Sequence, residues 1–304
     1  MVFLYEISAP KKEFNRKKNY SKVSSKLPSI LINGHKTDQV SVLDRGFQYG
    51  HGLFETIHVV DDEPQYWLQH MERLLEGCSR LEIPVPELSV IQREAKNLCA
   101  GITEGVLKIT ITRGTGGRGY AAGESENNTR VLAMFPAPQY SEACWSEGVV
   151  VKLCNTRLGI NPALAGIKHL NRLEQVLAHA EWCSKDIHEG LMLDINNNVI
   201  EGAKSNVFCV KNGELYTPDL TLCGVRGIMR EQVIKLAKQT GILVHETQLT
   251  LDDLYQADEF FLSNSLIGLW PVRLLEDHSF KVGPMSRQFA SVLRNKTHGV
   301  ENVA

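Results

Sequence analysis

The sequence predicts an α+β fold divided into two domains. Its 304 residues suffice for two domains of ordinary size, and 43% of them are apolar, which is enough for a hydrophobic core in each. Short segments rich in β-branched residues are interspersed along the chain with longer segments that repeat apolar residues at helical spacing. This mixture is typical of strands and helices that pack together in layers.

The first domain is predicted to span residues 30–136. We expect strands at 29–32, 54–60, 106–112 and 130–135, and helices at 66–81 and 88–100. Asn33 and Gly34 stand between two apolar stretches and are a hairpin signal, because both residue types tolerate a positive φ. Residues 30–136 are therefore predicted to form a small α/β domain.

The second, larger domain is predicted at residues 148–296, after a linker at 137–147. We expect strands at 148–154, 189–195, 206–210, 242–248 and 259–263, and helices at 171–184, 227–240 and 284–295. The asparagines at 196–198 predict a turn between two of these strands. The helix at 171–184 has an apolar stripe that we expect to face the core, made of Leu173, Val176, Leu177 and Ala180.

The two ends of the chain differ from the rest. Residues 1–29 hold seven basic and two acidic side chains without periodicity, which predicts a flexible basic N-terminal extension. Residues 297–304 are expected to form a short tail. The whole chain has a net charge of −2 and no run of about 18 apolar residues, so we expect neither a nucleic acid nor a membrane partner.

The seven cysteines form no C-x-x-C pair and are scattered along the chain. Their odd number and spacing argue against a disulfide framework and against a zinc site, so we expect no metal. Reduced thiols inside a cytoplasmic protein are the simplest interpretation.

Residues 114–119, Gly-Thr-Gly-Gly-Arg-Gly, match the dinucleotide-binding pattern G-x-G-x-x-G and follow a predicted strand. That pattern also needs a helix directly afterwards, whose N-terminus receives the pyrophosphate. Residues 120–129 have no helical stripe. The sequence therefore favours a glycine-rich hairpin loop that could bring Arg118 and Tyr120 over a binding site.

Several residues have the chemistry that a pyridoxal phosphate site needs. Lys168 precedes the helix predicted at 171–184, whose dipole would favour the neutral amine that joins a carbonyl group. Glu201 could keep a pyridine nitrogen protonated, and the turn at 224–227 opens a helix that could receive a phosphate. Arg73 could add a fixed cation. Each residue alone is more often an ordinary surface or turn residue, so the prediction depends on their combination.

Over about residues 30–290 the chain resembles the class IV pyridoxal-phosphate-dependent aminotransferase family, which has fold type IV. The most specific stretch is 164–178, Leu-Ala-Gly-Ile-Lys-His-Leu-Asn-Arg-Leu-Glu-Gln-Val-Leu-Ala; further matching stretches are 41–50, 52–56, 113–120, Glu201 with Ser205-Asn206, and 224–230. One departure is His51, where relatives usually have aspartate.

The resemblance implies that pyridoxal 5'-phosphate binds between the two domains, attached to the amine of Lys168. Glu201 would pair with the pyridine nitrogen and Arg73 with the phosphate. Further cofactor contacts would come from Val225, Arg226 and Ser265, with the backbone of the first two donating to the phosphate. The family resemblance also implies a homodimer.

Within the family, the segments around Lys168 and Arg118 resemble the lyase branch, which converts 4-amino-4-deoxychorismate to 4-aminobenzoate and pyruvate in folate biosynthesis. Lys168 would then also be the catalytic acid and base. Arg118 suits bidentate binding of a substrate carboxylate, and Tyr120 could form a wall of the pocket. The alternative is an aminotransferase for branched-chain or D-amino acids, which would use Lys168 and Glu201 in the same way. A non-catalytic vitamin-B6-binding protein would need neither residue.

Overall fold

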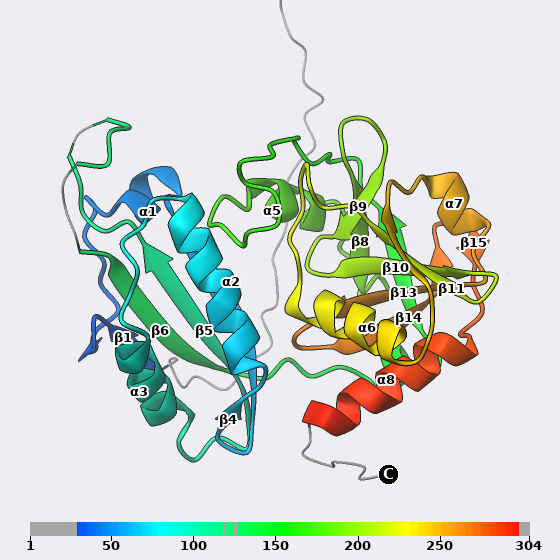
Figure 1. Ribbon diagram of the computed structural model, residues 1–304, viewed down its shortest axis with the longest axis horizontal. Coiled ribbons are helices and arrows are strands. Elements are labelled where there is room, and N and C mark those ends of the chain that lie inside the picture. Colours follow the sequence, from blue (N-terminus) through cyan, green and yellow to red (C-terminus); the bar gives the residue numbers. More distant parts are fainter. Residues whose placement is uncertain (1–28, 118, 124–126, 298–304) are drawn as a thin grey trace, which may run out of the picture.

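The computed structural model describes residues 29–117, 119–123 and 127–297, so the predicted N-terminal extension and C-terminal tail lie almost wholly outside it. The fold is α+β, as predicted. Two β-sheets stand side by side, each with its own helices, and α5 lies between them (Figure 1).

The first sheet has the strand order β2-β1-β6-β5-β3-β4, and all its neighbouring strands are antiparallel. Its strands are β1 (Ser29–Ile32), β2 (His35–Lys36), β3 (Gly52–Val60), β4 (Glu63–Pro64), β5 (Glu104–Thr112) and β6 (Thr129–Pro136). Asn33 and Gly34 form the predicted hairpin turn, with φ of 50° and 85°, so that Ile32 pairs with His35. The glycine-rich loop connects β5 to β6, and its described residues contain no helix, which excludes the dinucleotide-binding motif there.

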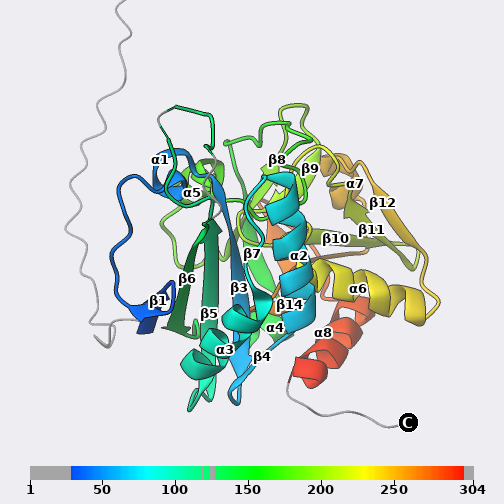
Figure 2. The ribbon, with the colours of Figure 1, turned by 60° about the vertical axis from the view of Figure 1, so that its left-hand side comes forward.

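Three helices accompany this sheet: α1 (Arg45–Tyr49), α2 (Trp67–Arg80) and α3 (Leu88–Cys99). The apolar side of α2 and α3 packs on β3 and β5, where Leu74 and Ile91 meet Ile57 and Ile109 in one fully buried cluster. The opposite side of α2 faces the second half of the molecule (Figure 2). This orientation places the polar residues of α2 next to the other sheet.

The second sheet closes on itself. Its strands are β7 (Val149–Leu153), β8 (Glu189–Leu193), β9 (Val199–Gly202), β10 (Asn206–Lys211), β11 (Glu214–Pro218), β12 (Val244–Thr247), β13 (Glu259–Asn264), β14 (Gly268–Leu275) and β15 (His278–Ser279). The order runs β10-β13-β14-β7-β8-β9, and β9 then pairs with β10 to complete a barrel. Trp270, Phe260 and Val207 fill a core cluster of these strands.

Strand β9 differs from the prediction. The asparagine turn, with Asn197 at φ 65°, leads directly from β8 into β9 rather than to the strand at 206. Glu201 consequently lies in a buried strand and not in a turn. The strand has only four residues, too few for a clear alternating pattern.

The remaining helices are α4 (Ala143–Ser146), α5 (Leu173–His179), α6 (Ile228–Gln239), α7 (Leu251–Tyr255) and α8 (Pro284–Thr297). Helices α6 and α8 lie beside each other on the outside of the barrel, where Val233 and Phe289 contact Phe208 and Phe261 (Figures 1 and 2). The short helix α4 lies in the segment predicted as a linker.

Helix α5 corrects two predictions. It covers 173–179 rather than 171–184, and its apolar stripe does not face the core. Leu173, Val176 and Leu177 are 68%, 60% and 53% exposed, and Ala180 is exposed as well, whereas Ala178 is buried. An apolar stripe shows that a surface is suited to being covered, but it does not identify what covers it.

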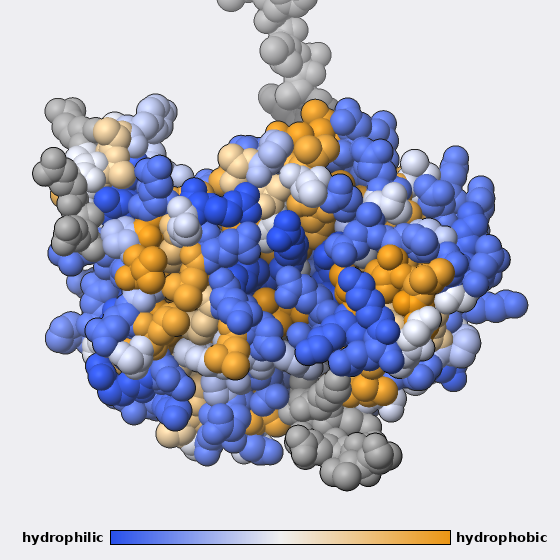
Figure 3. Space-filling model, viewed as in Figure 1, coloured by the Kyte–Doolittle hydropathy of each residue, from blue (hydrophilic) through white to orange (hydrophobic). Residues whose placement is uncertain are grey.

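No helix in the described ranges is long and apolar enough to cross a bilayer. The face seen in Figure 3 is mainly hydrophilic, and its hydrophobic residues form several separate patches. Such small patches are ordinary on the surface of a folded protein.

The start of α8 generates a stability prediction. Buried Glu259 on β13 accepts hydrogen bonds from the N–H groups of Met285 (3.0 Å) and Ser286 (2.8 Å). We expect Glu259→Ala to lower the free energy of unfolding by about 2–4 kcal/mol, because two buried N–H groups lose a charged acceptor. Chemical denaturation measures this. The control is Glu142→Ala, which removes an exposed ion pair of Arg294 on the same helix and should barely change the unfolding midpoint. Equal losses in both variants would contradict the prediction.

Candidate active site

A cavity of about 1000 Å³ lies between the two halves of the molecule. The first half contributes Phe54 and Thr56 from β3 and Arg73 from α2. The second half contributes a larger set that includes Lys168, Arg172, Gln175, Glu201, Lys204, Val225, Gly227, Ile228 and Ser265. Most of the residues that the sequence predicted for a cofactor site therefore line one cavity.

Lys168 lies in an extended segment that joins the two halves. The carbonyl of Lys168 accepts a hydrogen bond from Phe54 N–H (3.0 Å), and Leu170 N–H donates to Gly52 O (2.9 Å). Two residues earlier, Gly166 exchanges backbone hydrogen bonds with the 224–226 turn. Lys168 Nζ lies 4.4 Å from the centre of the Phe54 ring, in the wall of the cavity.

Burial, together with the nearby guanidinium of Arg73, lowers the pKa of Lys168 to about 8, while Glu55 acts in the opposite direction. A lysine with this pKa is partly neutral near physiological pH. The cause differs from the predicted one, because α5 begins only at Leu173, and burial rather than a helix dipole favours the amine.

Arg73 is fixed by a buried carboxylate. Its Nε donates to Glu55 Oε1 (2.9 Å), its Nη2 donates to Glu55 Oε2, and its Nη1 donates to the carbonyl of Arg226 (2.9 Å). His70 Nδ1 also lies 2.6 Å from Glu55 Oε2. Burial would raise the pKa of Glu55, but Arg73 and His70 together hold that pKa at about 2. The pair is therefore ionised, and the guanidinium has a fixed position beside the cavity.

Glu201 lies on β9 and is 4% exposed. Its Oε2 accepts a hydrogen bond from Val225 N–H (2.8 Å), and its Oε1 accepts a long one from Gln175 Nε2 (3.4 Å). Burial raises the pKa of Glu201, whereas the charge of Arg172 lowers that pKa. The protonation state of such a carboxyl therefore responds to any proton-bearing group that enters the cavity.

The N–H groups of the predicted turn before α6 are not all available to a ligand. The N–H groups of Val225 and Arg226 already donate to Glu201 Oε2 and to Gly166 O, so they are not available to a phosphate. Val225 itself lines the cavity. Gly227 and Ile228 line the same cavity, and within the described chain no side chain caps this end of α6. The helix start at Gly227, the last residue of the turn predicted at 224–227, therefore offers the first N–H groups that face the cavity.

Gly227 meets a steric requirement at this point. A Cβ atom there would lie 2.0 Å from Asn206 Oδ1, and Asn206 Nδ2 donates to the carbonyl of Val225 (2.8 Å). The amide of Asn206 therefore holds the turn closely, and a residue with a side chain would displace it.

Of the two predicted substrate residues, the structure describes only Tyr120, and it does not bring Tyr120 to the cavity. Arg118 lies outside the described residues. Tyr120 is 90% exposed, packs on Tyr49, and does not line the cavity of its own chain. Ser265, in the turn after β13, does line it. His51 contacts Leu81 O (2.8 Å) and Arg45 (3.4 Å), contacts that stabilise the loop around it.

Sequence analysis missed several residues that the structure places at the site. Glu55 could have been found from the sequence, because it is an acidic residue at an inward-facing position of a strand. Arg172 and Gln175 belong to the stretch that resembles the family, but their spacing indicated no role. Lys204 adds another cation to the cavity wall.

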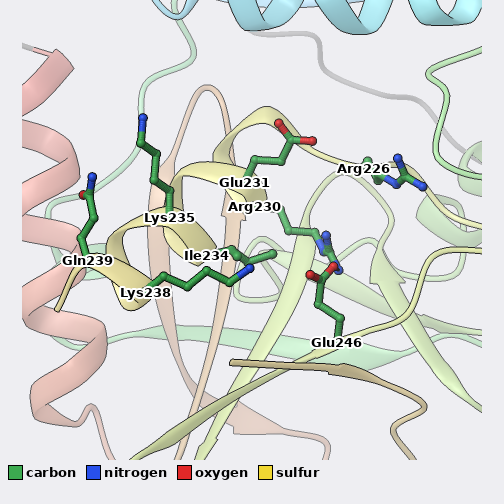
Figure 4. A pocket seen from close by; sticks show the side chains of 8 residues that line it. All are labelled: Arg226, Arg230, Glu231, Ile234, Lys235, Lys238, Gln239 and Glu246. Atoms are coloured by element: carbon green, nitrogen blue, oxygen red, sulfur yellow. The ribbon is translucent and has the colours of Figure 1, made fainter. Parts of the chain in front are cut away.

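A second hollow, of about 580 Å³, lies along α6 away from these residues (Figure 4). Arg226, Lys235 and Lys238 line it, and buried Arg230 pairs with Glu246 across it (2.9 Å). Neither Lys168 nor Glu201 reaches this hollow, so it is not the site of the predicted chemistry.

Comparison with known proteins finds a lyase and an aminotransferase that are similar to most of this chain. Aminodeoxychorismate lyase from Vibrio harveyi is 39% identical over 79% of this chain and 89% of that protein. A Thermotoga maritima relative described as a probable branched-chain-amino-acid aminotransferase is 44% identical over 75% of this chain and 78% of that protein.

Solved structures of a lyase and of an aminotransferase are also similar to this chain. The crystal structure of 4-amino-4-deoxychorismate lyase from Pseudomonas aeruginosa has a TM-score of 0.85 and 43% identity, and it matches 88% of this chain and 98% of that chain. The Escherichia coli branched-chain amino acid aminotransferase has a TM-score of 0.78 and 27% identity, matching 89% of this chain and 94% of that chain. The family model of class IV amino-transferases matches residues 52–275, and this chain therefore belongs to that family.

Proposed function

We propose that this protein is a pyridoxal-phosphate-dependent lyase that converts 4-amino-4-deoxychorismate to 4-aminobenzoate and pyruvate. The observation that carries the proposal is Lys168, whose amine has a lowered pKa, in one cavity with Glu201 and Arg73. The lyases from Vibrio harveyi and Pseudomonas aeruginosa match nearly their whole length to this chain, which supports this reaction.

The residues around the cavity fit pyridoxal 5'-phosphate. Lys168 would hold its carbonyl carbon, buried Glu201 its pyridine nitrogen, and Arg73 its phosphate. Further phosphate contacts would come from Ser265 and from the uncapped first turn of α6 at Gly227 and Ile228. When bound, the cofactor supplies a protonated ring that accepts electrons from the bond that breaks next to the substrate nitrogen.

Lys168 would act as the base and the acid of the reaction. Its amine, once released from the cofactor, removes the proton from the ring carbon that carries nitrogen, and later protonates the methylene carbon of the departing enolpyruvyl group. The ring carbon–oxygen bond breaks between these steps, so that the substrate yields aromatic 4-aminobenzoate and pyruvate without another reactant. A lysine with a pKa of about 8 can perform both transfers near neutral pH.

Glu55 would act through Arg73. Its ionised carboxylate fixes the guanidinium by two hydrogen bonds, so that the cation needs no rearrangement when the phosphate arrives. Arg73 also tethers the carbonyl of Arg226, which connects α2 to the start of α6.

Arg118 and Tyr120 remain our proposed substrate contacts. Buried Arg45 fixes the loop that holds them by donating to the carbonyls of Gly119 (3.0 Å), Tyr120 (2.8 Å) and Ala121 (3.2 Å). Because Tyr120 does not reach the cavity of its own chain, we propose that this loop serves the cavity of a second copy in a homodimer.

Exposed apolar residues support the dimer. Phe47 on α1 and Leu173 and Leu177 on α5 are all exposed, and the segments beside these helices are joined where Asn171, before α5, donates to Gly50 O, after α1 (3.2 Å). Six of the seven free cysteines are buried, which suits the reducing cytoplasm that we propose as the location.

The aminotransferase stays the second candidate, because the 44% identical Thermotoga maritima relative has that description. The two reactions would share Lys168, Glu201 and the phosphate contacts. They differ in the substrate and in the fate of its amino group, which stays with the 4-aminobenzoate in the lyase reaction and passes to a 2-oxo acid in transamination.

The reaction itself is tested with purified protein, added pyridoxal 5'-phosphate and enzymatically prepared 4-amino-4-deoxychorismate. We expect 4-aminobenzoate and pyruvate in equal amounts, and neither product with Lys168→Ala. A parallel assay offers branched-chain and D-amino acids with a 2-oxo acid acceptor. Transamination without 4-aminobenzoate would reject the lyase in favour of the second candidate.

The lowered pKa of Lys168 predicts how cofactor binding depends on pH. Only the neutral amine attacks a carbonyl, so the rate of cofactor uptake by the cofactor-free protein should rise through pH about 8 and level off above it. Stopped-flow absorbance between pH 6 and 10, within the titration range of such a lysine, measures this rate. A midpoint near the ordinary lysine value of 10.5 would contradict the burial argument.

The dimer predicts a change of mass. Light scattering should give the mass of two chains for the wild type and of one chain for Phe47→Lys/Leu177→Lys, because each substitution places a cation in an apolar contact. Leu68→Lys changes another exposed leucine, on α2, and should leave the mass unchanged. A wild-type protein with the mass of one chain would reject the dimer.

A further inference from the structure

We propose that the hollow along α6 is a second binding site of this protein, which takes a phosphorylated small molecule. The hollow, of about 580 Å³, lies away from Lys168 and Glu201, so the inference goes beyond the proposed lyase reaction. Its walls carry an excess of positive charge, with four cations against two carboxylates: Arg226, Arg230, Lys235 and Lys238 against Glu231 and Glu246 (Figure 4).

One face of α6 forms a wall of the hollow. Arg230, Ile234 and Lys238 follow one another at intervals of four residues along the helix, so they lie on the same side of it. Figure 4 shows the side chain of Lys238 extending along Ile234 toward the pair of Arg230 and Glu246. Glu246 comes from β12, so the hollow is bounded by a helix and by a strand.

Buried Arg230 gives the hollow a fixed cation with unused donors. The residue is 3% exposed, and both its hydrogen bonds come from Nη2, to Pro218 O (3.0 Å) and to Glu246 Oε2 (2.9 Å). Its Nε is buried, and no described residue accepts a hydrogen bond from it. Because the side chain of Glu246 is 48% exposed, an entering anion can displace that carboxylate from the guanidinium.

The other three cations are exposed and have no ion pair. Among the described residues, no carboxylate lies within ion-pair distance of Arg226, Lys235 or Lys238. Exposed lysines on a helix are ordinarily solvated, and their charge alone does not make a binding site. Here they lie around a concave surface that also contains a buried arginine, which favours a bound anion.

The balance of charge indicates the class of ligand. A single carboxylate would leave most of the positive charge in the hollow unpaired, whereas a phosphate or diphosphate group brings more charge and more acceptor oxygens to it. The two carboxylates in the walls disfavour a long polyanion such as a nucleic acid, which would pass close to both. A small molecule that carries a phosphate group therefore fits best.

Arg226 separates this hollow from the active cavity. Its N–H donates to Gly166 O (3.0 Å) and its carbonyl accepts from Arg73 (2.9 Å), so its backbone belongs to the cofactor side. Its side chain lines the hollow instead. A protein that has already bound its cofactor would therefore keep the hollow available to a second anion.

The first test titrates inorganic pyrophosphate into the protein saturated with pyridoxal 5'-phosphate, in a calorimeter and at fixed ionic strength. We expect saturable binding that Lys235→Ala/Lys238→Ala weakens about tenfold, because two cations of the hollow are lost. Both lysines are exposed, so the unfolding midpoint should not change. The control Lys96→Ala removes an exposed lysine of α3 and should leave the affinity unchanged.

The second test changes the affinity in the opposite direction. Glu246→Gln removes the carboxylate that occupies Arg230, so it should tighten pyrophosphate binding about threefold or more. The control Glu142→Gln removes the same charge from an exposed ion pair with Arg294 and should have no effect. A general response to the net charge of the protein would change both variants equally.

The outcomes are distinct for the hollow and for the proposed reaction. No saturable binding, or equal binding by the wild type and by Lys235→Ala/Lys238→Ala, overturns the inference. Acetate that binds as tightly as pyrophosphate rejects a phosphate group as the ligand. A protein that takes up no pyridoxal 5'-phosphate rejects the proposed function, and the same comparison of variants then still tests the hollow.

Discussion

The backbone hydrogen bonds of residues 166–170 are the constraint on which the rest of the site depends. This extended segment bonds to β3 through Lys168 and Leu170 and to the turn before α6 through Gly166. It therefore joins the antiparallel sheet to the barrel at the point where the cavity lies. These hydrogen bonds fix the backbone on both sides of Lys168, and burial is the main reason that its pKa is low.

The buried pair of Glu55 and Arg73 adds a second connection between the halves. The carboxylate comes from β3, the guanidinium from α2, and the guanidinium also binds the carbonyl of Arg226 at the start of α6. A cation at this depth would be costly without its carboxylate. The ion pair that offsets the cost of burying Arg73 thus also fixes its guanidinium for an anionic ligand. Arg172 has a similar guanidinium, which backbone carbonyls hold in place.

Much of the fold was predictable because its signals are local. The Asn33-Gly34 hairpin requires two positive φ angles, and α2 shows apolar residues at helical spacing up to its end near Arg80. Strand β9 escaped prediction because four buried residues carry no periodic signal. The stripe of α5 was expected to face the core, but it is exposed. Apolar residues at helical spacing indicate a surface suited to being covered, and they do not show which element covers it.

The sequence by itself determined the family, the α+β class and the chemical identity of Lys168, Glu201 and Arg73, because residue type and order along the chain are sufficient for these. Only the tertiary structure decided which groups are free to act. It directed the N–H groups of Val225 and Arg226 to internal acceptors, left the start of α6 uncapped, and paired Arg73 with Glu55. Hydrogen-bond partners and burial arise from contacts between residues distant in sequence, and the spacing along the chain does not contain them.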